Sequence, residues 1–307
     1  MASTLTVSRR SWPISRPLDL RRTLGVLCHG AGDPVARFAG GRFWWASRTP
    51  LGPGTIALSA GSGELLAEAW GPGAPWLLDG VPELVGEADD WSQLDLSGQR
   101  LLGEIRHRLP GVRLTRSRRI LDSLVPACLE QRVTGQEAFR AWRQLSRRFG
   151  EPAPGPAEFP MWLPALPSRL LEVPTWEWHR LAVDAQRQRA IRAVATVAAR
   201  LEECVTMPLA EVHRRLRSVP GVGQWTVAET TVRALGDPDA VSVGDFHLAN
   251  RVGWLLTGQP RSSDETMLEL LEPWRGQRAR VIKLIELSGF APPKYGPRFS
   301  PNDIRRI

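Results

Sequence analysis

The chain has 307 residues, enough for about two domains, and its 42% hydrophobic and 23% charged residues are typical of a globular protein rather than a disordered one. It has no uninterrupted apolar run of about 20 residues, which excludes a membrane-spanning helix, and residues 1–22 lack the apolar core of a secretory signal. We therefore expect a soluble cytoplasmic protein with no membrane partner.

The net charge of +8 is concentrated in one stretch of the chain. Residues 100–150 contain twelve arginines and four acidic residues, so this stretch carries the whole excess. Clustered arginines are typical of a protein that binds a polyanion such as nucleic acid, because they release the counterions condensed on its phosphates. The alternative is an arginine-rich helix face in contact with water.

The three cysteines, Cys28, Cys128 and Cys204, lie too far apart for metal ligation and are too few for a disulfide scaffold or a four-cysteine iron–sulfur cluster. The five histidines are equally scattered, so a zinc site is not expected. We expect small buried thiols and no iron–sulfur cluster.

Residues 1–112 predict a small antiparallel β domain with flanking helices. Asp19 is placed to cap a helix over Leu20–Leu27, since its side chain can accept from free N–H groups. Short apolar runs broken by glycine or proline follow at intervals of about ten residues, the pattern of antiparallel strands. The expected strands lie in Gly40–Trp45, Gly54–Leu58 and Gly63–Trp70.

Residues 113–290 predict a helical domain, because apolar residues there recur at intervals of three and four. Seven prolines between Glu151 and Pro174 predict an irregular connection, and Ser262 with Glu265 has the spacing of a capping box. Residues 291–307 predict a frayed tail. The expected helices cover residues 117–129, 136–149, 178–201, 209–216, 225–235, 246–256, 265–271 and 277–287.

The sharpest local motif is a Pro-Gly-x-Gly turn between two predicted helices, within Leu216–Ala228. Glycines there permit positive φ and a close approach of phosphate to the backbone. The N–H groups of Gly221, Gly223 and Gln224, at the positive end of the second helix, can hold a phosphate without reading sequence. The alternative is a plain turn between helices, which many proteins contain.

Asp245 is the candidate catalytic residue. Its position alone predicts that Asp245 caps the apolar helix that follows it. It lies 22 residues after Gly223, however, and one helix with a return loop would place its carboxylate near the turn.

A hairpin followed by such an aspartate resembles the helix-hairpin-helix DNA glycosylases, and the whole chain resembles their 3-methyladenine DNA glycosylase II (AlkA) branch. The resemblance is clearest over residues 110–290. It implies an α+β fold, with an N-terminal antiparallel β domain before a two-lobed all-α core. The matching segments are Pro17-Leu18-Asp19, Leu24-Gly25, Leu129-Glu130-Gln131-Arg132-Val133-Thr134 and Pro273-Trp274-Arg275.

The resemblance implies hydrolysis of the N-glycosidic bond of alkylated purines, such as 3-methyladenine or 7-methylguanine, after the base is flipped out of the duplex. A fixed carboxylate, here Asp245, stabilises the oxocarbenium-like sugar. By analogy Trp225 and Trp274 line the base pocket, where an aromatic face attracts a cationic base; core packing is the alternative for each. The expected partner is double-stranded DNA with alkylated bases, bound by a monomer.

Three further residues bear on the sub-class. Members that also cut the DNA backbone carry a lysine where this chain has Trp225, which implies a monofunctional enzyme without lyase activity. Arg132 stands where the AlkA branch has a leucine wedge, and an arginine there stacks on bases or simply lies on the surface. Glu229 replaces a pocket tyrosine, and we expect it to face solvent rather than a cationic base.

The family also implies one structural ion and no other cofactor. Backbone carbonyls of Arg217, Val219 and Val222 correspond to those that hold a monovalent cation, Na⁺ or K⁺, at the hairpin.

Two other functions remain open at this point. One is a non-catalytic DNA-binding protein that keeps the hairpin for lesion recognition, and it has no need of Asp245. The other is a glycosylase for oxidised or mismatched bases, which the missing lysine and missing cysteine cluster disfavour.

Overall fold

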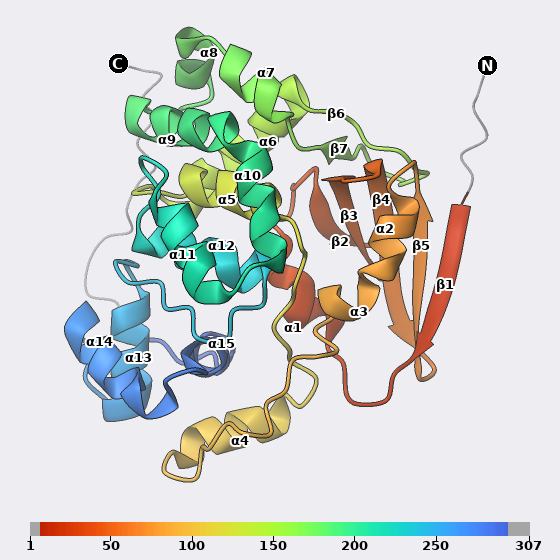
Figure 1. Ribbon diagram of the computed structural model, residues 1–307. Coiled ribbons are helices and arrows are strands. Elements are labelled where there is room, and N and C mark those ends of the chain that lie inside the picture. The colour runs from red at the N-terminus through yellow and green to blue at the C-terminus, as the bar shows by residue number, and fades with distance from the viewer. Residues whose placement is uncertain (1–6, 294–307) are drawn as a thin grey trace.

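The computed structural model describes residues 7–293, which form a five-stranded antiparallel sheet and a larger helical part (Figure 1). This confirms the predicted α+β class. The predicted frayed tail lies outside the described residues from residue 294 onward. Within residues 7–293, every helix is too short or too polar to cross a membrane.

The sheet has the strand order β1-β5-β4-β3-β2, and all neighbouring strands are antiparallel. The turn between β4 and β5 contains Ser62 and Gly63 with φ of 52° and 79°, the conformation that two-residue hairpins favour. Three strands confirm the prediction, whereas β1 and β2 are too short or too rich in arginine to stand out in the sequence. The strands are β1 (Val7–Pro13), β2 (Ala36–Ala39), β3 (Arg42–Thr49), β4 (Gly52–Gly61) and β5 (Glu64–Trp70), with β6 (Glu151–Pro152) and β7 (Trp162–Leu163) as a separate pair.

Short helices flank the sheet. The Asp19 side chain accepts from the backbone N–H of Arg22 at 2.9 Å and caps α1, as predicted. Two helices that the sequence did not reveal carry proline in their first turn, where its missing N–H is no loss. These elements are α1 (Leu20–Leu24), η1 (Gly25–Leu27), α2 (Ala74–Asp79), α3 (Val81–Leu84) and α4 (Arg100–Arg108).

After residue 117 the predicted helices are largely confirmed, with two corrections. The helix expected over residues 178–201 is divided into three, because Asp184 caps a new helix through the N–H groups of Gln186 and Arg187. The segment expected to be irregular contains a helix that begins at Pro167. The helices of this region are α5 (Ile120–Leu129), α6 (Gly135–Phe149), α7 (Pro167–Glu172), α8 (Thr175–Arg180), α9 (Ala185–Thr196), α10 (Ala198–Glu202) and η2 (Glu203–Thr206).

The remaining helices follow the prediction closely. One cap is displaced by a residue: Ser263, not Ser262, accepts from the backbone N–H of Thr266 at 3.2 Å. These helices are α11 (Leu209–Arg217), α12 (Gln224–Ala234), α13 (Leu248–Thr257), α14 (Asp264–Leu271), η3 (Glu272–Trp274) and α15 (Arg278–Leu287).

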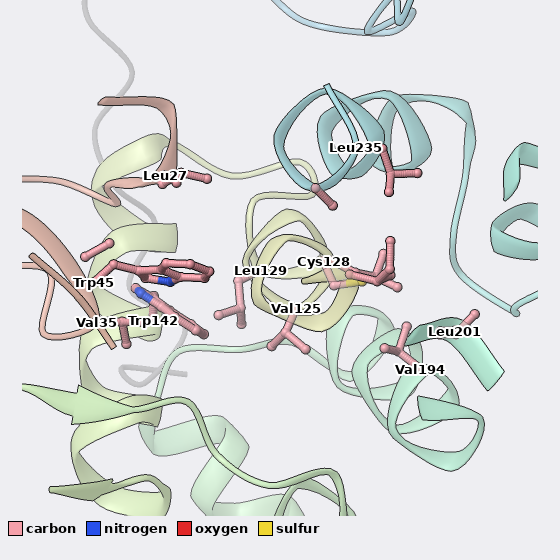
Figure 2. Close-up of a cluster of buried hydrophobic side chains, with 14 of the residues drawn as sticks. Leu27, Val35, Trp45, Val125, Cys128, Leu129, Trp142, Val194, Leu201 and Leu235 are labelled. Atoms are coloured by element: carbon pink, nitrogen blue, oxygen red, sulfur yellow. The ribbon is translucent and has the colours of Figure 1, made fainter. Parts of the chain in front are cut away.

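A first hydrophobic core joins the sheet to the helices, with α5 at its centre. Eight of the ten α5 residues are buried, because this helix is apolar on nearly all sides. Figure 2 shows Trp45 of β3 and Trp142 of α6 on one side of α5, and Val194 of α9 and Leu201 of α10 on the other.

A second core is formed by α4 with the C-terminal helices α13, α14 and α15. Trp91 and the α4 residues Leu102 and Ile105 are buried here with Val252 of α13. Residues 91–112 therefore pack against α13, α14 and α15, although the predicted boundary at residue 112 assigns them to the N-terminal domain. The domain division at that residue stays a prediction.

The arginine-rich stretch does not form one surface. It runs from α4, at the lower end of the molecule in Figure 1, through the central α5 to α6. At least six of its twelve arginines pair with carboxylates, among them Arg113 with Glu87 at 2.7 Å and Arg119 with Glu202 at 3.1 Å. Much of this positive charge is therefore neutralised by ion pairs within the protein. The net charge of the stretch overstates the positive charge that is available to bind a polyanion.

The three cysteines are free thiols, Cys128 and Cys204 buried and Cys28 half-buried. Burial raises the pKa of Cys28 and of Cys128 to about 12, so these thiols stay protonated and weakly reactive. This matches the expected apolar role for the two buried thiols.

Candidate active site

The turn between α11 and α12 is a tight hairpin in which the two glycines have different functions. Gly221 has a φ of +86°, which favours glycine, and a Cβ there would lie 2.7 Å from the Ala190 side chain. Gly223 has a φ of −89° and open space where a Cβ would lie. The expectation of positive φ is therefore correct for Gly221 and wrong for Gly223, whose missing side chain instead leaves room in front of α12.

The start of α12 has the features of an anion site. Gly221, Gly223 and Gln224 are exposed. The first N–H groups of a helix have no partner within it, and they lie at the positive end of the helix dipole. A phosphate can approach them closely, because Gly223 has no side chain.

The junction between α5 and α6 is bound to this hairpin. The Gln131 side-chain amide donates to the Gly221 carbonyl and to the Thr226 hydroxyl, both at 2.9 Å. Its neighbour Arg132 is exposed and has a φ of +56°, a conformation that costs a non-glycine residue roughly 1–2 kcal/mol. The predicted wedge residue therefore lies next to the residue that holds the hairpin.

Asp245 is held against the hairpin helix, as its spacing predicts. Its Oδ1 accepts the backbone N–H groups of His247 and Leu248, both at 2.8 Å, so the expected capping function is also present. Its Oδ2 accepts the indole N–H of Trp225 at 3.3 Å. The cap begins α13 at Leu248, two residues later than predicted.

A cavity of about 120 Å³ lies beside Asp245. Its walls come from α1 and η1, residues 113–115, α12, residues 240–245, α13 and α15, and its apolar lining is mostly a small buried cluster of Leu114, Ala228, Ala240 and Ala279. One water molecule needs only roughly 10–15 Å³ of such volume, and this cavity therefore has room for a much larger ligand. A second cavity, beside His29 and Trp142, has a volume of only about 10 Å³ and is too small for such a ligand.

Glu229 and Arg233 of α12 form a fixed charge pair in the cavity wall. Arg233 donates to the Glu229 carboxylate at 2.6 Å and to the Val26 carbonyl at 3.0 Å, and the Ser242 hydroxyl donates to the other Glu229 oxygen. Burial lowers the pKa of Arg233, but Glu229 and Glu130 outweigh it, so that the pKa is raised. The expectation that Glu229 faces solvent is therefore wrong, because its partners hold it in the wall.

Two charged residues of α15, Lys283 and Glu286, also line the cavity. Lys283 is only 8% exposed, and no hydrogen bond or ion pair links its ammonium to the described residues. Burial lowers the pKa of Lys283 to about 8. Glu286 opens into the cavity, and the surrounding protein, with the carboxylates of Glu229 and Asp245, raises its pKa.

Neither of the two tryptophans expected in the base pocket lines this cavity, and their function in base binding stays a prediction. Trp274 is buried in the second core, and its indole N–H donates to the Asp95 carbonyl at 2.7 Å, which agrees with the alternative of core packing. Trp225 contacts Asp245 but does not line the cavity. The cavity has no aromatic side chain among its described lining residues.

Comparison with known proteins supports the resemblance seen in the sequence. No family model matches the chain. The chain is 29% identical over 176 residues to the probable bifunctional transcriptional activator/DNA repair enzyme AlkA of Mycobacterium tuberculosis. That match covers 56% of this chain, and the chain spans about one third of the length of the curated relatives it matches (33%).

Solved structures agree over nearly the whole chain. A 3-methyladenine DNA-glycosylase from Archaeoglobus fulgidus has a TM-score of 0.77 at 16% identity, covering 92% of this chain and 99% of its own. The chain has the helix-hairpin-helix glycosylase fold. The 8-oxoguanine glycosylase/lyase of Clostridium acetobutylicum, solved with double-stranded DNA, shares this glycosylase fold with a TM-score of 0.71 at 12% identity over 91% of this chain and 96% of its own.

Within this glycosylase fold, sequence reasoning located the hairpin and Asp245 but missed the charged wall of the cavity. Lys283 lies between Ile282 and Leu284, in a helix that is otherwise mostly buried and apolar. A charged residue within such an apolar run is the sequence signal that could have revealed the charged wall of the cavity.

Proposed function

We propose that the protein is a monofunctional DNA glycosylase of base excision repair. It hydrolyses the N-glycosidic bond of alkylated purines, such as 3-methyladenine and 7-methylguanine, after base flipping. The observation that carries the proposal is the position of Asp245, beside an anion-binding helix start and at a cavity with room for more than water.

Asp245 is the catalytic residue of this mechanism. Its Oδ1 is fixed by two backbone N–H groups, so the carboxylate does not reorient during the reaction. Among the described residues its Oδ2 accepts only the 3.3 Å hydrogen bond from Trp225, and it stabilises the positive charge that develops on the sugar. The base leaves into the cavity beside it.

The hairpin positions DNA for this step. The N–H groups of Gly221, Gly223 and Gln224 hold a phosphate near the target nucleotide. Arg132 fills the stack that the flipped base leaves. The partner in this proposal is double-stranded DNA with alkylated bases, bound by a single copy of the chain.

A monovalent cation, Na⁺ or K⁺, belongs to the hairpin in this proposal. Its ligands are the backbone carbonyls of Arg217, Val219 and Val222, oxygen donors that suit a hard cation. The last two residues have buried side chains, and the Val222 N–H donates to the Val219 carbonyl at 3.0 Å, which fixes the turn. The ion supplies positive charge close to the bound phosphate.

The absence of lyase activity rests on Trp225. The position that carries the Schiff-base lysine in the bifunctional members has no amine here. The product is therefore DNA with an intact abasic site.

The test is release of free bases from methylated duplex DNA, followed by chromatography. We expect the wild type to release 3-methyladenine or 7-methylguanine and to leave the strand uncut until alkali is added. Asp245→Asn keeps the capping oxygen and removes the charge, so it should slow release at least about 100-fold while preserving DNA affinity.

Asp264→Asn is the matched control. Asp264 accepts the backbone N–H of Gly244 at 2.9 Å, next to Asp245, but it does not line the cavity. Release that persists in Asp245→Asn would remove Asp245 from the mechanism. Tight binding of damaged DNA without any release would favour the non-catalytic alternative.

A further inference from the structure

We propose that Lys283 and Glu286 read the edge of the flipped base and make the cavity selective for 6-oxopurine lesions, such as 7-methylguanine, over 6-aminopurine lesions, such as 3-methyladenine. The inference rests on the proposed function. It assigns the specificity of the cavity to two residues of α15 that lie three positions apart and therefore on one face of the helix.

Lys283 has the properties of a group that awaits a ligand. Its side chain is buried but for 8%, it reaches the cavity, and no described residue binds its ammonium. Buried charges in folded proteins are normally paired or hydrogen-bonded. The other cationic side chains of the cavity wall have such partners: Arg233 binds Glu229, and Arg113 binds Glu87.

The chemistry of the ammonium decides which base fits. Lysine has three donors and no acceptor, so it pairs with a carbonyl oxygen and not with an amino group. A 6-oxopurine presents that oxygen beside a ring N–H donor, and a 6-aminopurine presents the reverse order, an amino donor beside the ring acceptor N1. When the amino group lies against Lys283, donor faces donor and the N1 acceptor faces the Glu286 carboxylate, a mismatch that a site built to hydrogen-bond its substrate rejects strongly.

Glu286 completes the pair. Glu286 lines the same cavity and is exposed, so its carboxylate can accept the N–H groups that lie next to the carbonyl of a guanine-type base. Glu229 is less available for this contact, because Arg233 and Ser242 already donate to its two oxygens. With no aromatic side chain in the described wall, recognition falls to these polar groups.

Methylated duplex DNA carries both lesions, and both are cationic, so their relative release reports on the base edge rather than on charge. We expect Lys283→Met, a substitution of similar length, to slow release of 7-methylguanine at least about tenfold and to change release of 3-methyladenine less than about twofold. Ile282→Val is the control, because it alters the same wall without removing a polar group. It should leave the ratio of the two rates unchanged.

An unchanged ratio in Lys283→Met would overturn this inference, and the proposed function would still stand if Asp245→Asn abolished release. If the wild type releases neither base, the proposed function fails, and binding of the free bases decides the specificity. Tighter binding of free 7-methylguanine than of free 3-methyladenine, lost in Lys283→Met, would support the inference. Equal binding of the two bases would refute it.

Discussion

Lys283→Met should stabilise the protein at neutral pH. Burial lowers the pKa of Lys283 from its ordinary value of 10.5 to about 8, because the surrounding protein cannot solvate the charge as water does. A difference of that size between folded and unfolded chain corresponds to about 3 kcal/mol of unfavourable free energy at neutral pH. Methionine fills a similar volume without a charge, so the variant should recover up to about this amount.

The pH dependence identifies the cause. The unfolded chain binds more protons than the folded one between pH 8 and 10.5, so the Lys283 contribution to stability rises with pH over that range. Below pH 8 the full cost is present, and above 10.5 it is gone. Urea unfolding of both proteins at pH 7 and at pH 10.5 measures the difference. A gain that is absent at pH 7, or equal at both pH values, would refute the reasoning.

Two predictions concern DNA binding. Gly223→Asp puts bulk and negative charge in front of α12 and should weaken binding of any duplex at least about tenfold at low salt. Gly98→Asp, at an equally open glycine outside the hairpin, is the control, and equal affinities of the two variants in a fluorescence titration would exclude the hairpin as the anchor. Arg132→Ala should slow excision from fully paired duplexes more than from bulged ones, since a bulged base needs less help to leave the stack. Equal losses on the two substrates, measured under single-turnover conditions, would argue against a wedge.

The hairpin and the position of Asp245 could be predicted because each depends on local sequence. Glycines mark the turn, and Asp245 precedes an apolar helix that it must cap. The contact between Asp245 and Trp225 then follows from chain length, since one helix and a short loop leave little freedom.

The cavity wall could not be predicted in this way, because it is assembled from segments far apart in the chain. Arg233 binds the Val26 carbonyl, 207 residues earlier, and this contact fixes Glu229 in the wall. The position of Trp274 could not be predicted for the same reason, because its indole N–H donates to the Asp95 carbonyl, 179 residues earlier, in a core that no local pattern reveals. The family resemblance suggested where Glu229 and Trp274 lie, but long-range packing determines their actual surroundings.

The stability of Lys283→Met and its base preference together test whether the buried lysine serves recognition. Among the described residues the Lys283 ammonium has no hydrogen-bond partner, and the nearby Glu286 does not offset the cost of burial, so a ligand in the cavity would explain the charge. A variant that is more stable and has lost its preference for 7-methylguanine would show stability exchanged for specificity at one residue. A variant that is more stable and releases both bases as the wild type does would show a buried lysine without a function in recognition, and the specificity of the cavity would then have to come from its shape alone.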